Sequence, residues 1–225
     1  MTDRPVIVAR VTTPRGELVL RRAGDAHELI EDGTFLMDTR DGRSERRLVE
    51  AALARHQAPH DVLIGGLGMG FSLVAALRDP RVRRVTVVEI EPVVVEWHAT
   101  HLRPVSRGAL DDPRVRIVVD DLASHLVGAS SAYDIVCIDV DNGPEWTVTG
   151  ANAALYDDAG TGLVVGAARR GGLVSVWAAA ASPRYEECLR RHLEEVAVIE
   201  VPAARGAPDV IYVGRRPDAE AAARP

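Results

Sequence analysis

The sequence predicts an α/β protein in which a small antiparallel β-sheet precedes a seven-stranded, mostly parallel sheet. Two observations predict this fold. From about residue 59 to residue 213, short apolar runs alternate with helical patterns, which is typical of parallel strands joined by helices. Before residue 43, short apolar runs are separated by turn residues instead, which favours hairpins.

Composition and charge narrow the class of protein. Of the 225 residues, 47% are hydrophobic and 27% are charged, which favours a packed core over disorder. The net charge of −6 argues against a protein that holds nucleic acid by neutralising phosphates. We find no apolar run that suits a membrane span or a signal peptide, and the two cysteines do not form a disulfide framework. We therefore expect a cytoplasmic protein with a small-molecule substrate.

The chain divides into three predicted segments. Residues 1–42 contain three or four short strands, and an Asp-Gly pair at Asp32 marks a hairpin. Residues 43–215 form the main domain, which opens with a helix capped by Ser44 and running to about His56. Residues 216–225 form a polar tail.

Seven apolar runs predict the strands of the main sheet, and the last is expected to be antiparallel. They are residues 62–64, 85–88, 115–119, 135–138, 173–177, 196–201 and 210–213. Helices are expected at 71–77, from Pro92 onward, at 122–126 and at 185–193. A turn at Gly171-Gly172 is expected before the fifth strand.

A glycine turn follows the first core strand in the stretch DVLIGGLGMG, which starts at Asp61. The turn glycines that we expect to contact a ligand are Gly65, Gly66, Gly68 and Gly70. A dinucleotide-binding turn requires glycine or alanine where Phe71 stands, so this Rossmann-like turn fits S-adenosylmethionine (SAM) or a relative better. Glu89 ends the next strand, where its two carboxylate oxygens suit both ribose hydroxyls.

Two more strands end in acidic residues, and ligands of open α/β sheets bind beyond such ends. Asp121 suits the amine of adenine, with the Leu122 N–H directed to a ring nitrogen; a helix N-cap is the alternative role of Asp121. Asp139 and Asp141 are the candidate catalytic residues, which would deprotonate an attacking amine or balance a sulfonium charge. Simple turn formation is the alternative role of this segment.

We expect no metal in this chemistry. His98 and His101 are three residues apart on a helix, but no carboxylate or cysteine pattern supports them as ligands. Trp146, Tyr156 and Trp177 are expected near the cleft from their positions in the sequence, either holding a cation or filling the core.

Several motifs together resemble the spermidine synthase (polyamine aminopropyltransferase) family, which has the SAM-dependent methyltransferase fold. The resemblance covers residues 5–215 and rests on the N-terminal sheet, VTVVEIEP, DDPRV and YDIVCIDVDNGP, together with Glu45 and the Leu155-Tyr156 pair. It implies that Glu89 binds ribose, that Asp121 binds adenine and that Asp139 accepts the amine proton. It also implies SAM or decarboxylated SAM as co-substrate and a homodimer paired through the N-terminal sheet.

The chain departs from the family pattern in the half of the site that takes the amine. Gly68 stands where the family has an aspartate, and the glutamine expected near Phe35 is absent. Arg43-Ser44 replaces a Tyr-His pair, and the aspartate loop is one residue shorter.

We interpret the chain as a spermidine-synthase-like transferase that moves an aminopropyl-type group to an amine and releases methylthioadenosine. Three alternatives remain at this stage. They are a methyltransferase, an intramolecular cyclisation of SAM that also releases methylthioadenosine, and a nucleoside-binding module without catalysis.

Overall fold

The N-terminal part of the computed structural model is a separate four-stranded sheet. The structure describes residues 4–140, 142–145, 150–203 and 206–218. The strands β1 (Val6–Thr13), β2 (Gly16–Ala23), β3 (Ala26–Glu31) and β4 (Thr34–Asp38) pair antiparallel in chain order. Asp32 and Gly33 join β3 to β4 with φ values of 46° and 78°, the conformation of a two-residue hairpin turn. The predicted hairpin and small sheet are confirmed.

The main sheet has seven strands in the order β10-β11-β9-β8-β5-β6-β7. Its strands are β5 (Asp61–Gly65), β6 (Arg84–Glu89), β7 (Val115–Val119), β8 (Tyr133–Ile138), β9 (Ala168–Ala178), β10 (Glu194–Val201) and β11 (Asp209–Arg215). The strands from β9 through β7 are parallel, whereas β11 runs antiparallel to both β9 and β10. The predicted fold class, including the antiparallel last strand, is confirmed.

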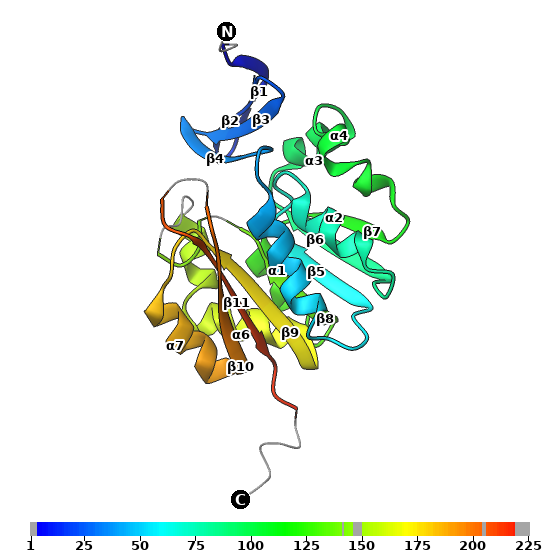
Figure 1. The fold of residues 1–225 in the computed structure, drawn as a ribbon, viewed down its shortest axis with the longest axis vertical. Helices are drawn as coiled ribbons and strands as arrows, with labels where there is room; N and C mark the ends of the chain where they lie inside the picture. Colours follow the sequence, from blue (N-terminus) through cyan, green and yellow to red (C-terminus); the bar gives the residue numbers. More distant parts are fainter. Residues whose placement is uncertain (1–3, 141, 146–149, 204–205, 219–225) are drawn as a thin grey trace, which may run out of the picture.

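Helices cover both faces of this sheet (Figure 1). They are α1 (Arg43–Leu53), α2 (Phe71–Arg78), α3 (Pro92–Ala99), α4 (Arg103–Ser106), α5 (Leu122–Val127), α6 (Asp158–Ala167) and α7 (Pro183–His192), with 3₁₀ turns η1 (Ala109–Asp111) and η2 (Gly150–Leu155). Successive residues of a strand point to opposite faces. Ile64 therefore packs in one apolar cluster with α1, α2 and α3, while Leu63 packs in another with α5, α6 and α7.

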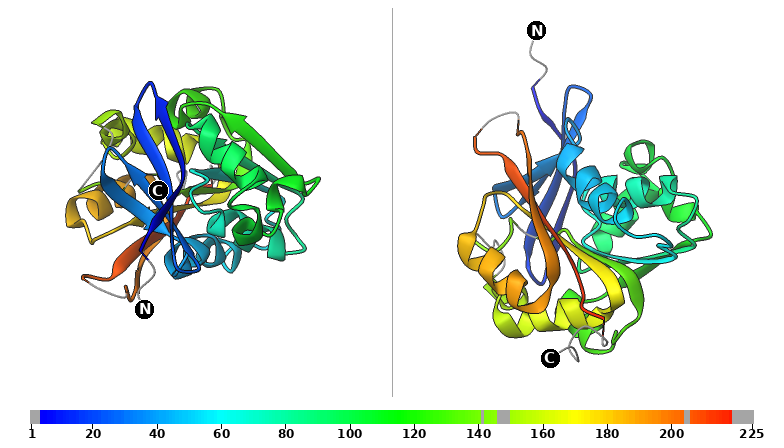
Figure 2. Two further views of the ribbon diagram at one scale, coloured as in Figure 1. Left: turned by 90° about the horizontal axis from the view of Figure 1, so that it is seen from above. Right: turned by 60° about the horizontal axis from the view of Figure 1, so that its bottom comes forward.

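The N-terminal sheet lies across one end of the main sheet (Figure 2). Leu18, Leu20 and Leu29 of the small sheet belong to the same buried cluster as Leu48 of α1. The small sheet is thus attached by shared apolar burial, and the division at residue 42 into domains stays a prediction. Its position places it over the carboxyl ends of β5, β6 and β8.

Three local predictions need correction or extension. Ser44 is not the N-cap of α1: Gly42 takes that position, and Ser44 lies inside the helix with its hydroxyl donating to Glu45. The turn expected at Gly171-Gly172 lies inside β9, which begins at Ala168. Helix α6 is absent from the sequence prediction because its three glycines lower the helix propensity of the segment.

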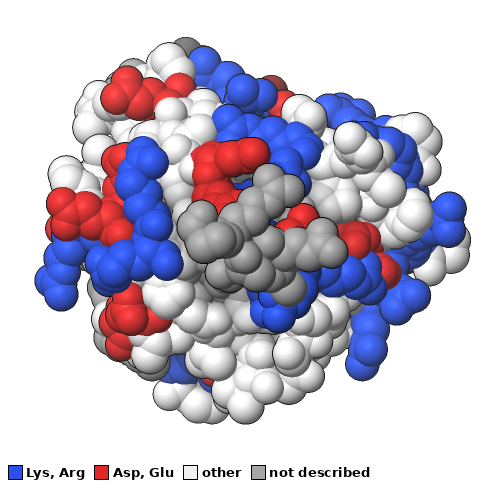
Figure 3. Space-filling view, turned by 90° about the horizontal axis from the view of Figure 1, so that it is seen from below, with Lys and Arg blue, Asp and Glu red and all other residues white. Residues whose placement is uncertain are grey.

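Charges of both signs mix on the surface. Figure 3 shows acidic and basic side chains interspersed on the face seen from below, without a large basic field. This pattern agrees with the net charge of −6. Within the described part of the chain, no helix has the length and apolar character needed to cross a membrane.

Candidate active site

A pocket of about 370 Å³ lies between the N-terminal sheet and the carboxyl ends of the core strands. The predicted site residues that line it are Gly66, Gly68, Glu89, Asp121, Leu122 and Asp139. Gly65 and Gly70 shape the turn beside this pocket. Asp141 lies outside the described residues. The sequence therefore anticipated most of one wall, whose members come from the ends of four different elements.

The glycine turn is held against the neighbouring strand ends. The Gly66 N–H donates to the Val88 carbonyl, and the Asp139 N–H donates to the Gly65 carbonyl, both at 2.8 Å. Gly66 has φ 93°, and a Cβ there would overlap the Asp139 carbonyl oxygen. Glycine is required at this position because the backbone of β8 passes where a side chain would begin. Gly70, with φ 81°, is the N-cap of α2.

Glu89 is buried at the end of β6 with its carboxylate lining the pocket. Its two oxygens accept hydrogen bonds from the N–H groups of Leu67 and Glu91, each at 2.9 Å. Burial raises the pKa of Glu89, against the lowering effect of these backbone donors. A carboxylate has about four acceptor positions. The backbone bonds therefore fix its orientation and leave it able to accept hydroxyl groups of a ligand.

Asp121 is the N-cap of α5, and it also lies in the pocket, where its role toward adenine stays a prediction. Its Oδ1 accepts from the Ser124 N–H at 2.8 Å, so it is the N-cap of α5. It also lines the pocket together with Leu122, which is buried. The N-cap bond fixes the side chain and the direction of the first N–H groups of α5.

Asp139, at the end of β8, belongs to a group of acids. Its Oδ2 accepts from the Ser72 hydroxyl at 2.6 Å, and Ser72 itself is buried at the start of α2. Burial, followed by the nearby charge of Asp139, raises the pKa of Glu45 to about 7. Burial likewise raises the pKa of Asp139 to about 6. Asp209, beside Ser44, is a third pocket acid whose pKa burial raises. Anionic groups crowded in this way favour a bound cation.

The raised pKa of Glu45 predicts that the stability difference between the wild type and a variant without this carboxyl depends on pH. Glu45 binds its proton more tightly in the folded than in the unfolded chain. The folded protein therefore loses stability as pH rises from about 4 to about 7, where Glu45 gives up that proton. Glu45→Gln removes this loss. We expect its melting temperature to exceed that of the wild type by about 2–4 °C or more at pH 8, and to match it at pH 4.5. Glu50→Gln, on the exposed face of α1, is the control. If Glu45→Gln differed from the wild type in melting temperature by the same amount at both pH values, this effect of the Glu45 pKa would be contradicted.

Residues from the N-terminal sheet also border the pocket, and no sequence pattern predicted the contacts of Arg15 and Thr13. Arg15, in the β1–β2 turn, donates through Nε to Glu91 Oε1 at 2.5 Å and through Nη2 to the Ile90 carbonyl at 2.7 Å. Thr13 donates to the same Glu91 oxygen at 3.2 Å. Glu91 is buried, and its Oε2 has no hydrogen-bond partner within the described part of the chain. These contacts fasten the small sheet next to Glu89.

Two side chains, those of His98 and Met37, lie close to Gly68. His98 is buried, and its Nε2 lies 2.9 Å from the Gly68 carbonyl oxygen, the geometry of a hydrogen bond. Burial lowers the pKa of His98, and Nε2 is the donor because a carbonyl oxygen can only accept. A Cβ at Gly68 would lie 2.9 Å from Met37 Sδ. His98 thus supports the glycine turn through this hydrogen bond.

The aromatic residues expected near the cleft take different positions in the structure. Trp177 lines the pocket from β9. Tyr156 is buried, and its hydroxyl donates to the Val140 carbonyl at 2.7 Å, next to Asp139. Trp146 lies outside the described residues.

Comparison with known proteins gives consistent matches. Residues 43–196 match the family model described as the spermine/spermidine synthase domain. A polyamine aminopropyltransferase of Mycobacterium tuberculosis (strain CDC 1551 / Oshkosh) is 35% identical over 179 residues, which cover 77% of this chain and 33% of that protein. Polyamine aminopropyltransferase 2 of Pseudomonas aeruginosa is 38% identical over 133 residues, covering 57% of this chain and 36% of that protein. The chain thus spans about a third of the length of these curated relatives.

Solved structures share the fold. A spermidine synthase in complex with the transition-state analogue AdoDATO superposes with a TM-score of 0.78 at 18% identity, covering 93% of this chain and 73% of that one. The spermidine synthase of Thermotoga maritima gives a TM-score of 0.76 at 17% identity, covering 93% and 72%.

Proposed function

Since the chain belongs to the spermine/spermidine synthase family, we propose that it transfers an aminopropyl group from decarboxylated SAM to an amine. The amine nitrogen attacks the methylene carbon bonded to the sulfonium. A C–N bond forms and the C–S bond breaks. Its electron pair returns to sulfur, which leaves as the neutral thioether methylthioadenosine. The nitrogen gives up one proton.

The observation that carries this proposal is the position of Asp139. It lies in the same pocket as Glu89 and the glycine turn, and Ser72 fixes its side chain. We assign Glu89 to the ribose hydroxyls, Asp121 and the Leu122 N–H to adenine, and Asp139 to the proton of the attacking amine. Asp141 would assist Asp139. A sulfonium electrophile needs no metal for this step.

The cluster of acids suits the nucleophile. An amine enters as an ammonium ion, and the carboxylates of Glu45, Asp139 and Asp209 offset the cost of bringing this charge out of water. A positioned base then removes the proton, and holding the nitrogen in line with the breaking C–S bond lowers the barrier further.

Removal of the Glu89 carboxylate is expected to weaken donor binding at least tenfold. Each charge-assisted hydrogen bond to the ribose contributes roughly 1.5–3 kcal/mol at most. Titration calorimetry with methylthioadenosine on Glu89→Ala measures the loss, and Glu96→Ala on the exposed side of α3 serves as control. Unchanged nucleoside affinity in Glu89→Ala would remove the basis for the nucleoside site.

The structure of the turn favours a second candidate reaction. Met37 packs on Gly68, where the resembled family has an aspartate, and Phe35 and Leu36 line the same wall. An apolar wall suits a less polar acceptor than putrescine, or an internal reaction in which SAM attacks its own side chain. This second reaction also releases methylthioadenosine but needs no amine.

One product assay separates these candidates. The purified chain is offered decarboxylated SAM with and without putrescine, and SAM alone, and the nucleoside is identified by chromatography. Methylthioadenosine that depends on an amine supports the transferase. Its release from SAM alone supports cyclisation, S-adenosylhomocysteine indicates methyl transfer, and binding without any product indicates a nucleoside-binding module.

We also propose that the chain forms a homodimer through its N-terminal sheet. Val6 and Ile7 on the edge strand β1 are 56% and 50% exposed, which leaves an apolar edge available for pairing. Light scattering should give twice the chain mass for the wild type and a monomer for the double variant Val6→Glu with Ile7→Glu. Val127→Glu, at another exposed site, is the control. A monomeric wild type would contradict this proposal.

A further inference from the structure

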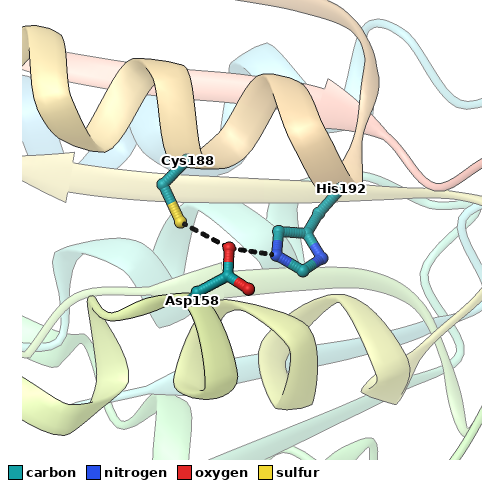
Figure 4. Close-up of side chains that lie close together, drawn as sticks. All are labelled: Asp158, Cys188 and His192. Atoms are coloured by element: carbon teal, nitrogen blue, oxygen red, sulfur yellow. Dashed lines mark hydrogen bonds and ion pairs between the residues drawn. The ribbon is translucent and has the colours of Figure 1, made fainter.

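A second group of chemically reactive side chains lies away from the pocket, between α6 and α7. Asp158 begins α6, while Cys188 and His192 are four residues apart on α7. Figure 4 shows the three side chains directed toward one another across the space between the two helices. Their ligand atoms all lie within 4.8 Å of one another, the one group of three such side chains found among the described residues.

The geometry points to a divalent metal site of the zinc class, formed by Asp158, Cys188 and His192. In a tetrahedral zinc site the bonds to sulfur, nitrogen and oxygen are about 2.3, 2.0 and 2.0 Å, which separates neighbouring ligand atoms by about 3.3–3.5 Å. Asp158 Oδ1 lies 3.1 Å from His192 Nε2 and 3.7 Å from Cys188 Sγ. The third separation, between Cys188 Sγ and the His192 nitrogen, is within 4.8 Å, so side-chain movements of about 1 Å admit the ion.

The donor set selects the metal. Thiolate and imidazole ligands favour zinc and similar transition metals over magnesium or calcium, which prefer oxygen. An aspartate and a thiolate supply two negative charges, which a divalent ion neutralises, and the thiol releases its proton on binding. Asp158 is 64% exposed, so water can occupy the fourth position. Cys188 is buried and is anchored by contact with the Thr161 hydroxyl at 3.5 Å.

Arg191 is the cation that would compete with a metal ion for Asp158. Its Nη2 donates to Asp158 Oδ1 at 2.8 Å, and together with His192 it lowers the pKa of that carboxyl. Its side chain is 58% exposed, so it can turn into solvent or move to the second oxygen when a metal binds. If the group were only an ion-pair network, loss of Arg191 would add no metal affinity.

The site would join two helices that pack on the same face of the main sheet. Asp158 follows Tyr156 closely, and the Tyr156 hydroxyl holds the Val140 carbonyl beside Asp139. A metal would therefore stiffen the support of one pocket wall without touching the substrate.

The test is metal titration of the full chain after removal of bound ions with a chelator. We expect one Zn²⁺ per chain by competition with a chromophoric chelator, and a thiolate-to-metal charge-transfer band with Co²⁺. Cys188→Ser should lose the band and bind Zn²⁺ at least about tenfold more weakly. His192→Gln, which is partly exposed and easily tolerated, should weaken binding to the same degree. Circular dichroism checks that each variant is folded.

Arg191→Gln provides the sharpest comparison, because it removes only the competitor. It should bind Zn²⁺ severalfold more tightly than the wild type, while the neighbouring Arg190→Gln and the exposed His101→Gln should bind as the wild type does. The proposal is overturned if the wild type takes up no stoichiometric ion. It is also overturned if Cys188→Ser keeps the wild-type affinity, or if Arg191→Gln binds as weakly as Cys188→Ser.

Discussion

Asp139→Asn should lower turnover by about two to four orders of magnitude, the usual range for a lost general base. The amide cannot take the proton of the attacking amine. Its oxygen can still accept the hydrogen bond that Ser72 donates to Asp139, so the side chain should keep its place. Donor affinity should change little because Glu89 and the glycine turn are untouched. Methylthioadenosine release measures turnover, and calorimetry measures donor affinity.

The control for this variant is Asp25→Asn, which removes an exposed carboxylate in the turn between β2 and β3. Its turnover should equal that of the wild type. The role of Asp139 as base is wrong if Asp139→Asn keeps turnover within about threefold of the wild type, well outside the range above. A parallel loss of donor affinity would indicate a binding role instead.

Gly66→Ala should lower kcat/KM by about a hundredfold or more. The added Cβ overlaps the Asp139 carbonyl oxygen and comes within 3.0 Å of its carbonyl carbon, so the end of β8 must move. A displacement of about 1 Å near reacting groups costs about 10²-fold in rate. Gly66 also donates to the Val88 carbonyl at 2.8 Å, so any movement of the turn itself strains this bond. Both donor affinity and turnover should therefore fall together.

The variant Gly24→Ala distinguishes the effect of the steric overlap in Gly66→Ala from the effect of backbone strain alone. Gly24 has φ 64°, also in the left-handed region, but a Cβ there meets nothing within 4 Å. This variant should lose a small amount of stability and keep full activity. Thermal melting of both variants shows whether Gly66→Ala is folded under the assay conditions. A folded Gly66→Ala with normal kinetics would show that the turn does not bind the donor as proposed.

Local sequence patterns were sufficient for most of the fold. The apolar runs of β5, β6, β7 and β8 could be predicted because a parallel strand buried on both faces must be apolar along its length. The β3–β4 hairpin followed from Asp32-Gly33, since the turn needs residues that tolerate positive φ. Helix α6 could not be predicted in this way, because its stability comes from packing against α7 and β9 rather than from its own residues.

The sequence by itself determined that the predicted site residues lie together. The glycine turn, Glu89, Asp121 and Asp139 each end a strand or begin a helix of the main sheet, and parallel strands bring such ends to one edge. The order of elements therefore places them together before any side-chain contact is known.

Only the tertiary structure decided which residues join them. Arg15 reaches Glu91 from 76 positions away, and Ser72 reaches Asp139 from 67 positions away. Met37 covers Gly68 because the small sheet lies over the end of the main one. The physical reason is that these contacts depend on how separate elements pack. Packing responds to the summed shape of buried side chains, whereas a local pattern records only which face of one element is apolar.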